Sequence, residues 1–260
     1  MITLTTDFGL SDAFVGTMKG VILSIAGQAR IVDITHEVPP QDIIAGALLI
    51  EEAYSYFPEG TIHVGIVDPG VGSSRAALAI QTQRYTFVGP DNGLFEPALA
   101  REHITKVIRL NNPEFQLSPV SATFHGRDVF APAAAHLENG IAVERLGDPA
   151  AQRQGITLPQ PVRHGDRLEI HVLRFDRFGN AITDLTRAEY DAWNTGGRVI
   201  RIETNGQTIA GLWSTFSDAP RGEAVAYFGS GGRLELAVHG GSAAEELGLA
   251  AGAAIAMVVS

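Results

Sequence analysis

The stretch IHVGIVDPGVGSSR, residues 62–75, shows the pattern that organises the first half of the chain. Its apolar run of β-branched and aliphatic residues is typical of a buried strand. The run ends on Asp68, turns through two glycines and closes on Arg75. Taken alone, the octet DPGVGSSR is typical of a strand-to-helix turn with a helix-capping serine. The same alternation of apolar run and polar turn recurs along the chain, and this recurrence decides the fold.

Short apolar runs that predict strands alternate with longer stretches of helical character. The predicted strands are 2–7, 30–35, 62–68, 76–82 and 85–91, and the predicted helices are 13–27, 40–57, 94–102 and 129–140. Such alternation is typical of βαβ units. Residues 1–152 are therefore expected to form an α/β domain with a mostly parallel sheet flanked by helices.

The composition and the periodicity of the sequence change after residue 152. Residues 153–165 are rich in Pro, Gly and Gln, and we expect a linker there. Residues 166–260 alternate in the manner of antiparallel strands, and the pair Asn205-Gly206 predicts a hairpin turn. The second domain is expected to be a smaller, mostly-β barrel.

Composition excludes several classes of function. A chain of 260 residues with a formal net charge of −10 and no basic run does not suit nucleic acid. It has no cysteine, which removes disulfides, zinc–thiolate sites and cysteine nucleophiles. No basic leader precedes the first strand, and every apolar stretch is too short for a membrane span. We expect a cytoplasmic protein that has no membrane partner, and any metal would need Asp, Glu and His as ligands.

Polar side chains follow several predicted strands. Asp7, Asp68 and the pair Asp91-Asn92 each come directly after an apolar run. Each one alone is more typical of a turn or a cap. Since the carboxyl ends of parallel strands meet at one edge of a sheet, where ligands bind, their recurrence indicates a site there.

The segment TFHGRDVFAP, residues 123–132, adds His125 and Arg127 just before a helix. His125 has the alternative of a buried or capping role, and Arg127 could simply pair with Asp128 on the surface. An Asp, an Arg and a His are a coherent set for activating water, because carboxylate and imidazole accept a proton while guanidinium favours hydroxide. The glycine turn at 70–75 lacks the Lys of a P-loop and the third Gly of a dinucleotide site, so we do not predict a phosphate site.

In the second half, RFDRFGNAITDL (174–185) places Phe178 beside Asn180. An aromatic ring and an amide together suit a purine, by stacking and by paired hydrogen bonds. A β-bulge with a buried Phe is an equally good interpretation. The segment GSGGRLELAV (229–238) supplies Ser230 and backbone groups that suit a carboxylate or a base edge.

Taken in order, the motifs of this chain resemble the S-adenosyl-L-methionine hydroxide adenosyltransferases, relatives of the bacterial fluorinating and chlorinating enzymes. The blocks that carry the resemblance are TTDFGLSD (5–12), DITHEVPPQDI (33–43), VDPGVGSSR (67–75), VGPDNGLF (88–95), TFHGRDVFAPAAAHL (123–137), FDRFGNAITDL (175–185) and GSGGRLELAVHG (229–240). They run through nearly the whole chain. The resemblance implies an α/β domain, a C-terminal barrel, a homotrimer with sites between subunits, and hydrolysis of S-adenosylmethionine to adenosine and methionine.

The resemblance also implies a role for individual residues. Those that match the water-activating set are Asp68, Arg75 and His125. Those that match substrate contacts are Asp7 (ribose hydroxyls), Phe8, Asp12 (near the methionine amino group), Phe124, Phe178 and Asn180 (adenine), Ser230 (methionine carboxylate), Glu235 and Val238. Gln41 stands where the halogenating relatives carry a tryptophan, so their ribose and adenine packing does not transfer to this segment.

The charges favour hydrolysis over halogenation, because the Asp68 carboxylate would repel a halide ion. Two other functions stay open from the residues alone. One is a metal-dependent phosphoesterase that uses Asp7, Asp12, Asp68 and His125 as ligands. The other is an adenosine-binding module without turnover.

Overall fold

The structure is a computed structural model that describes residues 1–259. The chain forms two compact units, Met1–Ile156 and a second that begins at Thr157. This boundary falls within the stretch 153–165 that the sequence predicts as a linker. The stretch is not wholly irregular, because strand β7 (Val162–His164) lies in it and pairs with β8.

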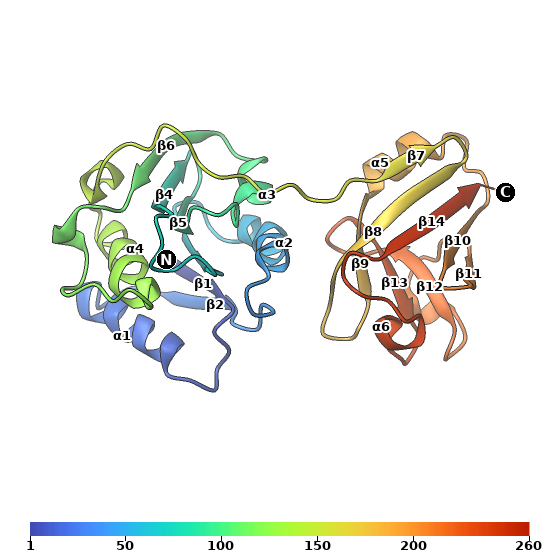
Figure 1. The fold of residues 1–260 in the computed structure, drawn as a ribbon, viewed down its shortest axis with the longest axis horizontal. Helices are drawn as coiled ribbons and strands as arrows, with labels where there is room; N and C mark the ends of the chain where they lie inside the picture. Colours follow the sequence, from blue (N-terminus) through green and yellow to red (C-terminus); the bar gives the residue numbers. More distant parts are fainter. Residues whose placement is uncertain (260) are drawn as a thin grey trace. The chain divides into compact units, whose positions relative to one another are not determined.

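The first unit is built on one sheet (Figure 1), whose strands lie in the order β2-β1-β3-β5-β4-β6. The strands are β1 (Ile2–Thr6), β2 (Ile31–Thr35), β3 (Ile62–Ile66), β4 (Ala77–Thr82), β5 (Thr86–Pro90) and β6 (Ile104–Arg109). Strands β2, β1, β3 and β5 pair in parallel, whereas β4 is antiparallel to both of its neighbours. The mostly parallel α/β sheet predicted from sequence is confirmed.

Helices cover both faces of this sheet. The helices are α1 (Phe14–Ile25), α2 (Ile43–Ala53), α3 (Glu96–Leu99) and α4 (Ala131–Glu138). Helices α1 and α4 pack together over one apolar core that includes Leu4 and Val64, while α2 and α3 pack over another that includes Phe87. Side chains of a strand alternate between the faces, so His63 of β3 lies against Tyr54 on the α2 side.

The chain reverses direction across the sheet between β1 and β3. After β1 it crosses through α1 to β2, and after β2 it returns through α2 to β3 on the other side of β1. Connections that leave the two strand ends in opposite directions open a crevice between them, and ligands of open α/β sheets bind there. Asp7 follows β1 and Asp68 follows β3, so the two residues lie on the two sides of this crevice.

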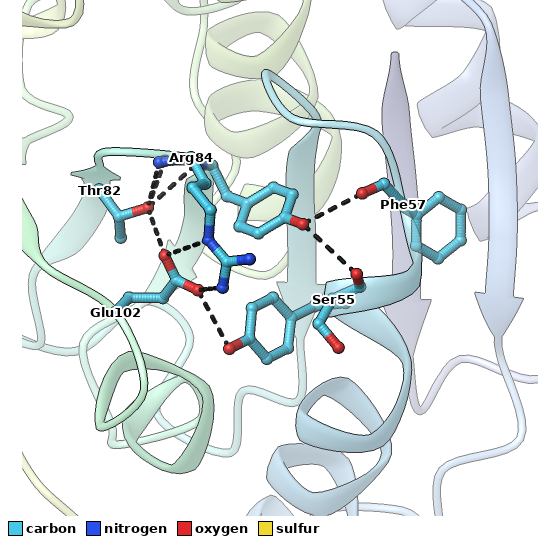
Figure 2. A network of polar contacts seen from close by, with 7 residues as sticks. Ser55, Phe57, Thr82, Arg84 and Glu102 are labelled. Atoms are coloured by element: carbon cyan, nitrogen blue, oxygen red, sulfur yellow. Dashed lines mark hydrogen bonds and ion pairs between the residues drawn. The ribbon is translucent and has the colours of Figure 1, made fainter.

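A polar network lies at the edge of the sheet opposite to the carboxyl ends of β1 and β3 (Figure 2). The side chain of Glu102 is 2% exposed and accepts hydrogen bonds from Tyr54, Thr82 and Arg84. The hydroxyl of Tyr85 donates to the Phe57 carbonyl. Burial and the charge of Glu102 raise the pKa of Tyr54 to about 12, so this hydroxyl stays protonated as a donor.

The second unit is an antiparallel sheet that curls into a nearly closed, barrel-like form, as the sequence predicts. Its strands are β7, β8 (Arg167–Phe175), β9 (Ala181–Thr186), β10 (Ile200–Thr204), β11 (Gln207–Ala210), β12 (Ala224–Phe228), β13 (Arg233–Val238) and β14 (Ala254–Val259), in the order β11-β10-β14-β8-β9-β13-β12. Asn205 and Gly206 have φ of 44° and 78° and form the predicted hairpin turn between β10 and β11.

The second unit also holds two helices, α5 (Arg187–Trp193) and α6 (Ala243–Glu246). The sequence predicts α6, whereas α5 is unexpected. Its first turn is capped by Thr186, whose side chain accepts from the Glu189 N–H while the Glu189 carboxylate accepts from the Thr186 N–H. Within residues 1–259, no helix has the length and apolar character that a membrane crossing requires.

Candidate functional site

A cleft of about 380 Å³ opens at the carboxyl ends of β1 and β3, at the reversal point of the sheet. The cleft is lined by the last residue of β3, by residues that follow β1, β2 and β3, and by residues that precede helix α4. They are Asp7, Phe8, Phe14, Pro40, Gln41, Ile66, Asp68, Pro69, Val71, Thr123, Phe124, His125 and Gly126. All of these residues belong to the first unit.

The octet DPGVGSSR forms one wall of this region, but not as a strand-to-helix turn. It connects β3 to β4, a strand, and the Ser73 hydroxyl accepts from the Arg75 N–H instead of capping a helix. Gly72 has φ of 76°, and a Cβ there would lie 2.3 Å from the Ala122 carbonyl oxygen. The loop therefore needs glycine in order to pack against the segment that carries His125.

Asp68 and Arg75 form a nearly buried ion pair, with side chains 5% and 7% exposed. Arg75 Nε donates to one Asp68 oxygen at 3.0 Å, and Nη2 donates to the other. The guanidinium also lies over the Phe130 ring, 5.3 Å from its centroid. Bidentate pairing fixes the plane of the carboxylate.

His125, from the segment before helix α4, joins this pair. Its Nδ1 lies 2.8 Å from Arg75 Nη2. A guanidinium has only donors, so Nδ1 must be the acceptor, and a neutral His125 then carries its proton on Nε2. Burial and the charge of Arg75 lower the pKa of His125, which keeps it neutral near pH 7. The predicted Asp–Arg–His set is thus brought together in space.

Asp7 is oriented by the backbone of the loop after β2. Its Oδ2 accepts the N–H of Gln41 at 2.8 Å. Gln41 has φ of 66°, a left-handed conformation that is uncommon outside glycine and that occurs often at functional sites. Asp7 is also one of the residues that line the cleft.

Three phenylalanines form the apolar wall of the cleft. Phe8, Phe14 and Phe124 have ring centroids 5.2 to 6.0 Å apart. Phe8 and Phe124 were expected near the substrate, whereas Phe14 was missed. The signal for it is an aromatic residue at the first position of the helix that follows the β1 loop.

The other polar residues of this half hold the framework. Arg127 pairs with Asp128, as one interpretation of the sequence allowed, but Asp128 is 1% exposed and not on the surface. Asn92 donates to the Val67 carbonyl, and Asp91 accepts from the Gln154 N–H. Asp12 lies exposed in the loop before α1, outside the cleft lining.

The four residues that a metal site would use are not arranged as ligands. Both oxygens of Asp68 are engaged by Arg75, and Asp12 lies outside the cleft lining. Among residues 1–259, no group of three or more His, Asp or Glu side chains has a metal-binding arrangement.

The residues expected to contact adenine and methionine lie in the second unit, on both ends of β9. Phe178 and Asn180 form the turn before β9, where Phe178 is 77% exposed. Ser230 lies in the turn before β13, whose first residue pairs with Thr186 at the far end of β9. Asn180 and Ser230 therefore lie near opposite ends of β9.

Glu235 and Val238 lie on β13. Glu235 faces Tyr227 across the β12–β13 pair, and burial together with the Glu235 charge raises the pKa of Tyr227. The Val238 side chain is 4% exposed and packs in the barrel core. Only the backbone of Val238 is therefore available to a ligand.

Fold and site together define a class: a two-unit protein with a mostly parallel α/β sheet, an Asp–Arg–His set at the sheet reversal, and a C-terminal barrel. Comparison with known proteins makes the class specific. Residues 2–147 match the SAM hydroxide adenosyltransferase N-terminal domain, and residues 170–256 match the C-terminal domain of the same family. The chain belongs to the SAM hydroxide adenosyltransferase family.

The similar proteins agree with this assignment. An (R)-S-adenosyl-L-methionine hydrolase of Thermus thermophilus is 43% identical over 95% of both chains. A fluorinase of Nocardia brasiliensis is 28% identical over 100% of this chain and 97% of its own. A solved structure of an uncharacterized conserved protein from Thermotoga maritima has a TM-score of 0.92, is 33% identical, and covers 99% of this chain and 100% of its own.

Proposed function

We propose that this chain hydrolyses S-adenosyl-L-methionine to adenosine and L-methionine. The family and the hydrolase relatives support the reaction, and the Asp68–Arg75–His125 set, whose Asp68 and His125 line the cleft, is the observation that supports the mechanism. The oxygen of water forms a bond to ribose C5′ while the C5′–S bond breaks. Its electron pair goes to sulfur, so methionine leaves as a neutral thioether and needs no general acid.

The hydrogen bonds assign the proton in this proposal. His125 has its Nδ1 occupied by Arg75 and its proton on Nε2, so it is a donor toward the nucleophile and not its base. Asp68 is then the group that accepts the proton of water before passing it to solvent. Two bonds from Arg75 hold the Asp68 carboxylate in a fixed orientation. Attack on a sulfonium neutralises charge, and in-line positioning supplies much of the acceleration.

Substrate binding is divided between the two units. We propose Asp7 for the ribose hydroxyls, with Phe8 and Phe124 as the apolar wall of the cleft. Substrate contacts in the barrel unit are assigned to Phe178, Asn180, Ser230, Glu235 and the backbone of Val238. The proposed role of Asp12, near the methionine amino group, would require its loop to approach the substrate. No metal or cofactor takes part in the proposed reaction.

The relatives also suggest which epimer of the substrate is used. The sulfonium sulfur carries three different groups and is therefore stereogenic. Three hydrolase relatives that are 37–43% identical are named for the (R) form. We assign the same epimer to this chain.

Three measurements on the purified protein test the function. Each epimer is incubated in ¹⁸O-labelled water, with and without a chelator, and the products are separated and weighed by mass spectrometry. We expect adenosine and methionine from the (R) form, with label in the 5′-hydroxyl and no effect of chelation. Unlabelled adenosine would rule out the proposed displacement at C5′. Loss of turnover with chelator would favour the phosphoesterase class.

The homotrimer and the cytoplasmic location stay predictions. The proposed water-activating residues lie in the first unit and the proposed adenine residues in the second, which fits sites shared between chains of a ring. Asp68→Asn and Asn180→Ala chains, refolded together, test this. Random mixing would restore roughly a quarter of the sites if each site is shared. Differently tagged chains show whether mixed trimers form, and inactive mixed trimers would contradict sharing.

A further inference from the structure

The turn between β8 and β9, residues 176–180, is held by a single carboxylate. Asp176 Oδ1 accepts the N–H groups of Phe178 and Asn180, at 2.8 and 2.9 Å. Its Oδ2 accepts from the Asn180 side-chain Nδ2 at 2.8 Å. The turn is also held from outside, because the Gly179 carbonyl accepts from the Ala244 N–H at 3.1 Å. Both the backbone and the amide of Asn180 are therefore positioned.

Asp176 decides which way the Asn180 amide faces. An ionised carboxylate has only acceptors, so the amide atom in contact with it must be the nitrogen. A flipped amide would bring two acceptor oxygens together, and this contact is unfavourable. Asn180 Oδ1 consequently faces away from Asp176, and the residue is only half-buried, so a ligand can reach it. The amide keeps a second N–H that can donate to a ligand.

We infer that Asp176 is a positioning residue that fixes the Asn180 amide, so that the base site selects a purine with an amino group at C6 over one with a carbonyl there. The inference rests on the proposed function, in which Asn180 contacts adenine. It adds Asp176 as a residue that acts on the base through Asn180.

The chemistry of the two bases explains the selection. Adenine presents the N6 donor beside the N7 acceptor, which match an amide oxygen and N–H in one orientation. Hypoxanthine presents O6 and N7, which are both acceptors. With the Asn180 oxygen fixed outward, O6 would meet another acceptor. A polar group left unpaired in this way is a strong basis for discrimination.

Binding to the unaltered protein is the first test. Calorimetry compares adenosine, purine riboside, which lacks a group at C6, and inosine. We expect purine riboside to bind about 10-fold more weakly than adenosine, and inosine about 100-fold more weakly. Inosine that binds as tightly as adenosine would overturn the inference, whatever any variant does.

Asp176→Asn is the second test. The side-chain oxygen of the variant would still accept the two backbone N–H groups, so the turn keeps its shape. Its new side-chain nitrogen would face Asn180 and require the Asn180 oxygen there, so the Asn180 amide flips. We expect the ratio of adenosine to inosine affinity to fall by about 10-fold or more. An equal loss of affinity for adenosine and inosine, with an unchanged circular dichroism spectrum, would show that Asp176 has a merely structural role and would overturn the inference.

Asp166→Asn is the matched control. Asp166 precedes the start of β8, at the other end of that strand, and its side chain is 73% exposed beside Arg198. Its variant should keep the wild-type affinity ratio. If the wild-type protein neither binds adenosine nor hydrolyses the substrate, the proposed function and this inference fall together. If it does both and the ratio is unaffected by Asp176→Asn, only the inference fails.

Discussion

Replacing Arg75 by Met should destabilise the first unit far more than an average substitution. The change leaves the Asp68 carboxylate, 5% exposed, without its partner. Removal of one member of a buried ion pair costs about 3–5 kcal/mol, because the other charge stays in a poorly solvated place. His125 also loses the Arg75 donor, and the pKa of His125 should rise, since the charge of Arg75 contributes to lowering it.

The double variant Asp68→Asn, Arg75→Met separates charge from packing. Neither buried charge remains in it, so it should be more stable than the sum of the single changes predicts, with a coupling of about 2–3 kcal/mol. All three variants should lack turnover. Asp68→Asn alone should still bind adenosine, because recognition is assigned to Asp7 and the barrel residues.

Urea unfolding followed by two probes measures this. Circular dichroism reports both units, while Trp193 and Trp213 lie in the second unit and report only that unit. The expected loss appears in the circular dichroism transition of the first unit and leaves the tryptophan transition in place. Additive costs of the two single changes would refute the argument from buried charge. A pKa of His125 that does not rise in Arg75→Met, followed by NMR, would refute the contact with Arg75.

Three further outcomes are expected. Burial lowers the pKa of His63 to about 4, so the unfolded chain takes up a proton at a higher pH than the folded chain does. The contribution of His63 to the free energy of unfolding should be fully present above pH 6.5 and fall by about 3 kcal/mol toward pH 4. The variant His63→Gln should flatten this slope in urea titrations. Glu102→Gln should lower the free energy of unfolding by about 1–3 kcal/mol, because it weakens the network of Figure 2. It should leave turnover unchanged, because this network lies at the edge opposite the cleft. A large loss of turnover would contradict that separation. Added chloride should give no 5′-chloro-5′-deoxyadenosine by chromatography, since Asp68 repels halide, and its appearance would remove the charge argument for hydrolysis.

Apolar periodicity predicted most strands and helices of the fold, because burial of a sheet core imposes that pattern locally. The direction of β4 could not be predicted this way. It follows from a three-residue connection to β5, which is too short for a parallel crossover. Helix α5 was missed because it has no clear apolar stripe; its signal is the capping pair Thr186 and Glu189.

For the site, strand ends indicated that Asp7 and Asp68 would meet at one edge, and the structure places both at the cleft. The contact between Arg75 and His125 spans fifty positions in the chain and depends on how the loop at Gly72 packs against Ala122. No local pattern encodes such a contact. The tautomer of His125 and the orientation of Asp7 likewise depend on partners that only the folded chain brings near.

The hold on Asp7 comes from the main chain of Gln41 and not from its side chain. Every amino acid except proline supplies this N–H, so the anchoring is indifferent to the identity of the residue. The side chain at position 41 reaches the cleft, and it can be exchanged without disturbing the Asp7 carboxylate that the main chain holds. The left-handed backbone narrows the choice, since glycine and asparagine adopt it most easily. Substitutions at position 41 could therefore change the ligand preference of the cleft during evolution while Asp7 keeps its place.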